Sequence, residues 1–211
     1  MDKKENVSGM DVVKKIAQRA KEVLLKPRDT FGVIKTETVT SRDLILNYLA
    51  PLAVIPAVAS IIGMSAVGIR ISIMGTFRIP LINSFSSAVL QYILTLIGIY
   101  ILGIIINALA PSFSGKKNEI QALKIAVYSA TPSLVVGILY ILPVLGILVV
   151  IAGLYGFYLL YLAIPIIMEC PPEKALGYTV VVIIINIVIS LIIGALVSFL
   201  PGVGMGFRFL G

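Results

Sequence analysis

The stretch YSATPSLVVGILYILPVLG, residues 128–146, decides how this chain folds. It lies within a long apolar run, Ile120–Met168, whose only charged residue is Lys124. As a single α-helix this run would be about 70 Å long, more than twice the hydrocarbon thickness of a bilayer. The run must therefore fold back once, and Pro143 is one of the few turn-forming residues near its middle. We predict a tight hairpin at Leu142–Gly146.

The whole chain has the composition of an integral membrane protein. Of its 211 residues, 59% are hydrophobic and only 13% are charged, with a mean hydropathy of +1.07. A bilayer core needs about 20 apolar residues per helix. We predict an all-α membrane protein, a five-helix transmembrane bundle preceded by an amphipathic surface helix. The five spans are Leu44–Val67, Leu81–Ala110, Ile120–Ile141, Leu145–Met168 and Leu176–Leu200.

Pro132 creates a local problem inside the third span. Proline has no N–H, so the carbonyl of Tyr128 loses its helical partner and needs a hydroxyl, a neighbouring helix or water. We expect Lys124 to reach the inner surface and pair with Glu119 or Glu169. One interpretation is that Lys124 anchors the span at the membrane surface and Pro132 kinks the helix. The other is that these residues form a polar notch, open to the cytoplasm, that binds a head group or a partner side chain. The candidate notch residues are Lys124, Tyr128, Ser129, Thr131 and Pro132.

A stripe of small and neutral polar residues follows one face of the second span and one face of the fifth. Such stripes let helix backbones approach closely, and amides can bridge them. We expect these stripes to be helix-packing seams, with a solute path or a homodimer face as alternatives. The most polar members of the candidate stripe are Gln91, Thr95, Asn186 and Ser190.

The basic residues indicate the topology. Ten Lys and Arg residues precede the first span, and with that end inside the count is 14 inside against 3 outside. By the positive-inside rule the N-terminus is cytoplasmic and the C-terminus is outside. We expect three parts: a basic amphipathic segment at 1–43, a transmembrane domain at 44–200 and a short outer tail at 201–211. The loop after the first span alternates Ile69, Ile71 and Ile73 with polar residues, and we expect it to rest at the membrane interface.

The N-terminal stretch GMDVVKKIAQRAKEVLLKP, residues 9–27, has the pattern of an amphipathic helix that ends at Pro27. It can lie on the inner leaflet, where anionic lipid attracts its lysines. Docking on the inner face of the bundle itself is the alternative.

The inventory of reactive residues argues against an enzyme. Histidine is absent and Cys170 is the only cysteine, so a zinc site, Cys–His catalysis and an internal disulfide are excluded. All ten acidic residues lie before the first span, in inner loops or at helix ends, which argues against a coupled pump. We therefore expect no catalytic residue, no cofactor and no metal, and we expect Cys170 to be a reduced thiol. The basic residues form no domain of their own, so we expect no nucleic-acid partner.

Several motifs in a fixed order resemble one known family. They are LLKPRDTFGVI (24–34), YLAPLAVIPAVASIIG (48–63), ALKIAVYSATPSLV (122–135), LPVLG (142–146) and YGFYLLYLAIPIIMECPPEKALGYTVVV (155–182). Together they resemble the Yip family of Ypt/Rab-interacting membrane proteins, in its prokaryotic-type branch. The resemblance implies a non-enzymatic membrane scaffold. The acidic–aromatic motif of the eukaryotic members is reduced here to Asp43, Leu44 and a displaced Pro51, so a Rab partner is not carried over.

We expect a scaffold that organises the membrane, or recruits a protein or lipid partner, at the cytoplasmic face of what we take to be a prokaryotic plasma membrane. The expected partners are the bilayer and anionic lipid of the inner leaflet; a homo-oligomer and a membrane-protein partner both stay open. The alternative function is a facilitative channel or carrier for a small solute or lipid.

Overall fold

Five helical segments of this computed structural model, which describes residues 9–71 and 75–199, are long and apolar enough to cross a membrane. The prediction of an all-α, five-span bundle is thereby confirmed. The spans are Ser41–Val67, Leu81–Phe113, Glu119–Ile141, Pro143–Met168 and Pro172–Ser198. The predicted end of the fifth span at Leu200 and the tail at 201–211 lie outside the described residues.

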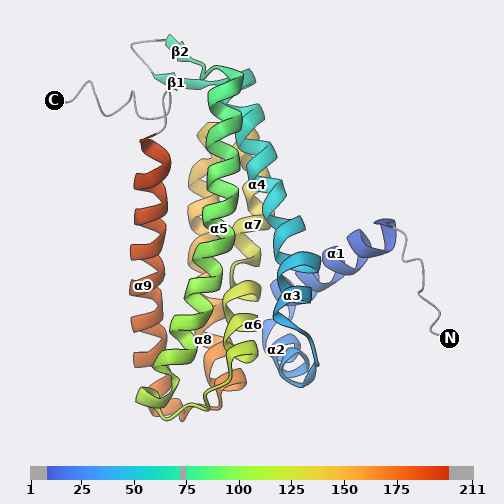
Figure 1. The fold of residues 1–211 in the computed structure, drawn as a ribbon, viewed down its shortest axis with the longest axis vertical. Helices are drawn as coiled ribbons and strands as arrows, with labels where there is room; N and C mark the ends of the chain where they lie inside the picture. Colours follow the sequence, from blue (N-terminus) through green and yellow to red (C-terminus); the bar gives the residue numbers. More distant parts are fainter. Residues whose placement is uncertain (1–8, 72–74, 200–211) are drawn as a thin grey trace.

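Most spans consist of a main helix with short adjoining turns (Figure 1). Before them come α1 (Gly9–Leu25) and α2 (Pro27–Thr36). The first span contains α3 (Ser41–Leu44), the π-helical η1 (Ile45–Leu49), α4 (Ala50–Ile62) and the π-helical η2 (Gly63–Val67). The second contains α5 (Leu81–Leu109) and η3 (Ala110–Phe113). The third contains α6 (Glu119–Ser129), α7 (Thr131–Val136) and η4 (Gly137–Ile141); the fourth, η5 (Pro143–Leu145) and α8 (Gly146–Met168); the fifth, α9 (Pro172–Ser198).

The third span is the core of the bundle. Of its most apolar stretch 67% is buried, against 28% and 33% in the first two spans, 44% in the fourth and 6% in the fifth. α6 packs against α5 and α8, whereas α7 packs against α4 and α8. The first, second and fourth spans thus pack around the third, and α9 stands at the edge of the bundle (Figure 1).

Pro132 breaks the third span instead of kinking it. α6 ends at Ser129, α7 starts at Thr131, and the Ala130 N–H donates to the Val127 carbonyl at 3.3 Å. The Ser129 carbonyl beside the break lies against Gly156 of α8, so closely that a Cβ at Gly156 would lie 2.7 Å from that oxygen. Glycine at 156 therefore lets the irregular backbone sit inside protein and not in lipid.

The predicted hairpin at Leu142–Gly146 is confirmed. η4 ends at Ile141 and α8 begins at Gly146, with two short-range hydrogen bonds, Leu142 N–H to Leu139 O at 3.0 Å and Leu145 N–H to Leu142 O at 2.8 Å, across the turn. Before this turn the chain passes so close to the first span that a Cβ at Gly63 would lie 1.9 Å from the Tyr140 carbonyl oxygen.

A short β-hairpin connects the first two spans at the end of the bundle away from α1 (Figure 1). β1 (Ile69–Ile71) pairs antiparallel with β2 (Gly75–Phe77), with Ile69 opposite Phe77. Residues 72–74, which include Ile73 of the predicted alternation, lie outside the described residues. Whether this hairpin rests at the interface stays a prediction.

The contact between α8 and the break in the third span can be tested with Gly156→Ala. The added methyl group would displace the Ser129 carbonyl in the most buried span, and overpacking of this kind costs about 1–3 kcal/mol. We expect a lower midpoint of thermal unfolding in detergent, followed by far-UV circular dichroism. Gly153→Ala is the matched control, because its nearest neighbour, the Ser133 hydroxyl, would lie at an ordinary 3.6 Å. Equal midpoints for the two variants would contradict this account.

Candidate functional site

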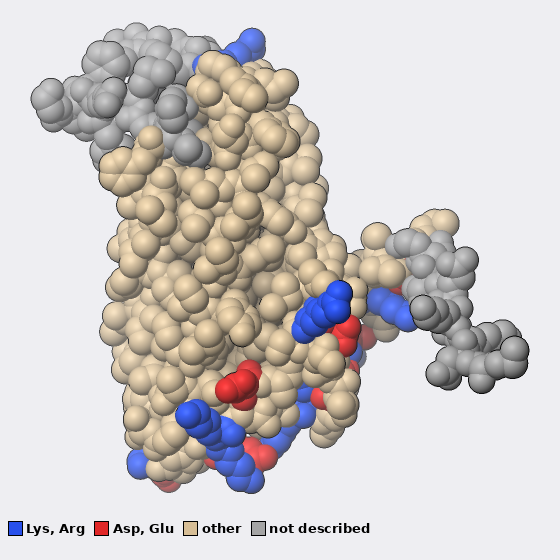
Figure 2. All heavy atoms as spheres, in the orientation of Figure 1, with Lys and Arg blue, Asp and Glu red and all other residues tan. Residues whose placement is uncertain are grey.

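Charged side chains gather at one end of the molecule. Figure 2 shows them around α1, α2 and the bottom of the bundle, below a broad band without charge. We call this the basic end: α1, α2, the connection 114–118 and the connection 169–171. From Gly9 to Thr36 it carries seven Lys and Arg against three Asp and Glu. An uncharged band above a charged end is typical of a protein that crosses the bilayer with one strongly basic surface.

Helix α1 lies across the axis of the bundle (Figure 1), docked on the bundle near one end and exposed near the other, and its contact with the inner leaflet stays a prediction. Near its C-terminal end Ala20 and Val23 are buried against the bundle, and the Tyr155 hydroxyl donates to the Leu24 carbonyl at 2.8 Å. Near its N-terminal end Met10 and Val13 are 70% and 64% exposed. The apolar arc of α1 is thus wider than the part that the bundle covers.

Lys124 secures α2 beneath the third span. Its ammonium donates to the Ile34 and Glu37 carbonyls, each at 2.7 Å, and the side chain is only 1% exposed. The expectation that Lys124 reaches the surface and pairs with Glu119 or Glu169 is wrong. The reason is that α2 folds under α6, so the carbonyls at the negative C-terminal end of its dipole meet the ammonium first.

Glu169 is instead bound by two other lysines. Its carboxylate pairs with Lys35 of α2 at 2.7 Å and with Lys116 of the connection 114–118. These contacts lower the pKa of Glu169 from its ordinary 4.5 to about 2, with the hydrogen bond from Lys116 as the largest cause. The cluster ties α2 to two connections between spans. Beside it, Cys170 is buried, and burial raises the pKa of its thiol.

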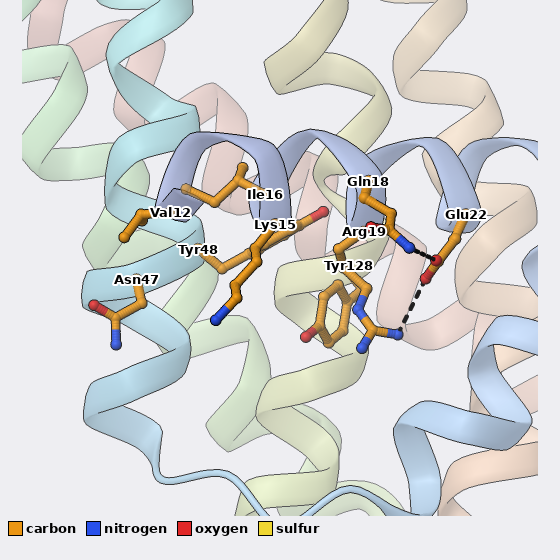
Figure 3. Close-up of a pocket in the computed structure, with 9 residues that line it drawn as sticks. All are labelled: Val12, Lys15, Ile16, Gln18, Arg19, Glu22, Asn47, Tyr48 and Tyr128. Atoms are coloured by element: carbon orange, nitrogen blue, oxygen red, sulfur yellow. Dashed lines mark hydrogen bonds and ion pairs between the residues drawn. The ribbon is translucent and has the colours of Figure 1, made fainter. Parts of the chain in front are cut away.

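A recess of about 610 Å³ opens beneath α1 at this end. Figure 3 shows Lys15 and Arg19 directed from α1 into it, Lys15 in front of Tyr48 and Arg19 beside the ring of Tyr128. Arg19 is shared by two carboxylates, with Glu22 at 3.5 Å and Glu37 closer. We call this the basic recess; its lining residues are Val12, Lys15, Ile16, Gln18, Arg19, Glu22, Asn47, Tyr48 and Tyr128.

The structure separates the predicted notch residues. Tyr128 lines the basic recess, and behind it the Thr131 hydroxyl is hydrogen-bonded to the Tyr48 hydroxyl at 2.9 Å. The Tyr48 and Tyr128 rings are in contact, with centroids 4.9 Å apart. Lys124 points to α2, Pro132 is buried at the break, and Ser129 faces the other side of the bundle. The role of these residues stays a prediction.

The predicted stripe residues do come together, around a cavity and not in a closed seam. Gln91, Thr95, Asn186 and Ser190 all line a space of about 280 Å³ between α5, the α6–α7 junction, α8 and α9. Ser129 lines it as well. The basic recess was not predicted. Its sequence signal is the pair Lys15 and Arg19, four residues apart on one face of α1. The residues that complete the recess, such as Tyr48 and Tyr128, are remote in sequence.

In the described part of the chain, no three or more Asp, Glu or Cys side chains gather as metal ligands would. What the basic end offers is hydrogen bonding and positive charge beside aromatic and aliphatic surface. This chemistry suits an anionic or amphipathic group.

The fold and this surface define the class: a multi-pass integral membrane protein that carries an amphipathic helix at one basic end. The Yip1 domain matches residues 21–200, which extends from within α1 beyond the end of α9. The chain therefore belongs to the Yip family. No curated protein and no solved structure matches it. The Yip family is not known for an enzymatic activity.

Lys124→Met should loosen α2. The substitution keeps the length of the side chain but leaves the Ile34 and Glu37 carbonyls without their donor, and a buried polar group without a partner costs about 1–3 kcal/mol. We expect a lower unfolding midpoint and faster tryptic cleavage after Arg28 and Lys35. Lys117→Met, at an exposed position, is the control. Cleavage of both variants at the wild-type rate would show that Lys124 does not hold α2.

The Glu169 cluster predicts a pH dependence. Because the pKa of Glu169 is lowered in the folded state, its contribution to stability is full above pH 4.5 and is lost as the pH falls toward 2. Glu169→Gln should therefore lower the unfolding midpoint at neutral pH and have a shrinking effect below pH 4.5. In a background of Lys35→Met and Lys116→Met it should have no effect at any pH. A midpoint difference that does not change with pH would refute this assignment.

Proposed function

We propose that this protein is a non-enzymatic membrane scaffold whose basic end faces the cytoplasm and gathers anionic lipid from the inner leaflet. The observation that carries the proposal is the basic recess beneath α1, where Lys15 and Arg19 stand over aromatic surface (Figure 3). A lipid head group combines the two features that such a site recognises, a phosphate and an apolar body.

The orientation of α1 supports contact with a bilayer surface. The helix lies across the spans, with Met10 and Val13 exposed on one side and Lys14 and Lys21 on the neighbouring polar side. An amphipathic helix in this position buries its free apolar arc at the boundary between head groups and acyl chains. Each lysine near an anionic surface adds attraction that salt screens.

Within the basic recess, Lys15 is the cation best placed to receive a phosphate. Arg19 already shares its charge with Glu22 and Glu37, whereas no ion pair within the described ranges involves Lys15. Asn47 adds an amide on the opposite wall, and the ring of Tyr128 offers apolar contact for the glycerol region of a lipid. Binding here would place one lipid between α1 and the first span.

With the basic end in the cytoplasm, we propose that the N-terminus is cytoplasmic and the C-terminus is outside. We also propose a prokaryotic plasma membrane as the location. Scaffold function would extend to a second copy or another membrane protein held at the same lipid-enriched surface. A facilitative channel or carrier is the rival function. It is less well supported, because at the basic end the Tyr178 ring stacks on Phe113 and its hydroxyl donates to the Ile106 carbonyl, which holds α9 against the second span there.

The test is lipid retention by the full chain. The protein is reconstituted with equal amounts of phosphatidylglycerol and phosphatidylcholine, extracted and examined by native mass spectrometry. We expect phosphatidylglycerol to be enriched several-fold, less so at high salt, and Lys15→Gln to remove most of the enrichment. Lys117→Gln makes the same charge change at an exposed residue away from the recess and should retain it. Equal loss in both variants, or no enrichment in the wild type, would reject the proposal.

A further inference from the structure

The cavity between α9 and the rest of the bundle lies on the other side of the third span from the basic recess and has a different character. It has a volume of about 280 Å³, and none of its lining residues is charged. Hydroxyl and amide groups from four helical segments point to the same space, among them Gln91, Thr95, Ser129, Ser133 and Asn186. Neutral hydrogen-bonding groups inside apolar walls suit a ligand that is itself uncharged.

Ser129 is the feature that a packing seam does not explain. The residue is 4% exposed, and its hydroxyl oxygen has no hydrogen-bond partner among the residues that the structure describes. Buried hydroxyls are normally hydrogen-bonded, because burial without a partner loses the bonds that water would provide. In a transmembrane helix the usual remedy is a bond to the carbonyl four residues back, as Ser190 makes to Asn186 at 2.8 Å. The Ser129 hydroxyl makes no such bond within the described residues, and Ser129 is one of the residues that line the cavity.

Helix α9 leaves this cavity open on the side of the lipid. Its buried residues are Ala175, Tyr178, Thr179 and Val182, all in the half next to the basic end. From 183 to 198 none of its residues is buried. In this half Ile189 and Ile193 contact α5 at Gly98. Gln91 and Ser190, which line the cavity, are exposed. The half of α9 next to the basic end is therefore the buried half, and the other half meets α5 at Gly98 without burying any of its own residues.

A second space of about 530 Å³ continues from the first. The two share Gln91, Thr95, Ser133, Leu134 and Ser190, and the second extends along α4 and α5 to Met64 and Ser84 near the β-hairpin. Its walls combine aliphatic side chains and Pro56 with the hydroxyls of several serines, and none of its lining residues is charged. Together the two spaces form one uncharged groove that leads toward the end opposite α1.

We infer that this pair of spaces binds an uncharged lipid that has a hydroxyl or ester carbonyl head, such as a diacylglycerol. The head accepts or donates hydrogen bonds at Ser129 and Asn186, and a chain lies in the groove along α5. A charged head group finds no counter-charge there and would be costly to bury. A water-soluble solute would need a route through the basic end, where Tyr178 stacks on Phe113. This inference goes beyond the proposed function and concerns a separate site.

The experiment uses the full chain in lipid nanodiscs with a diacylglycerol that carries a photoreactive diazirine on one chain. We expect saturable labelling of peptides from α5 and α9, with competition by unlabelled diacylglycerol but not by phosphatidylglycerol. Ser129→Ala should reduce labelling several-fold and Ser129→Ala combined with Asn186→Leu should abolish it. Ser86→Ala, the same change at an exposed serine of α5 that bonds its own helix, is the matched control and should label like the wild type.

A second measurement separates binding from stability. Because the Ser129 hydroxyl has no partner in the folded protein, Ser129→Ala should leave the unfolding midpoint unchanged or raise it. Labelling that is not saturable, or that Ser129→Ala does not reduce, would overturn the inference and leave a cavity filled by water alone. Glycerol uptake into proteoliposomes that Asn186→Leu abolishes would also overturn it, in favour of a solute path. Loss of phosphatidylglycerol enrichment with Lys15→Gln bears on the basic recess alone and leaves this test unaffected.

Discussion

The structure depends on one constraint, that the backbone of the third span must find its hydrogen bonds inside the protein. Pro132 interrupts the helix where a lipid-facing segment could not tolerate an interruption. The neighbouring helices pack against the break. α8 contacts it at Gly156, and the Tyr48 hydroxyl of the first span is hydrogen-bonded to the Thr131 hydroxyl. A broken helix can exist at this depth because the first, second and fourth spans pack around it.

Two surfaces follow from the same arrangement. On one side of the break, Tyr128 and Tyr48 form a wall under α1, and the basic recess lies against them. On the other side, Ser129 is turned toward α9, where the helices do not close. The two sides differ in charge: one has Lys15 and Arg19 near water, the other has only amides and hydroxyls at depth. A single irregular segment thus separates an anion-attracting site from an uncharged one.

Much of this fold could be predicted from the sequence, since helix length and apolarity are local properties. The five spans follow from apolar runs, and Pro143 and Gly146 mark the turn between the third and fourth. The partner of Lys124 could not be predicted, because Ile34 and Glu37 are about 90 residues away and only the folding of α2 under α6 brings them near. The stripe of Gln91, Thr95, Asn186 and Ser190 was visible, but periodicity identifies a face without saying how closely the facing helix approaches. That distance decides between a seam and a cavity.

The uneven burial of the spans has a consequence for how the molecule assembles. α9 contains no charged residue beyond its first turn and buries little of its surface against its neighbours, so it is stable as a single helix in hydrocarbon. The third span contains a lysine and a break, and it is stable in the bilayer only when other spans surround it. Assembly should therefore proceed from the inside outward: the first, second and fourth spans condense around the interrupted third, and α9 packs last, through Tyr178.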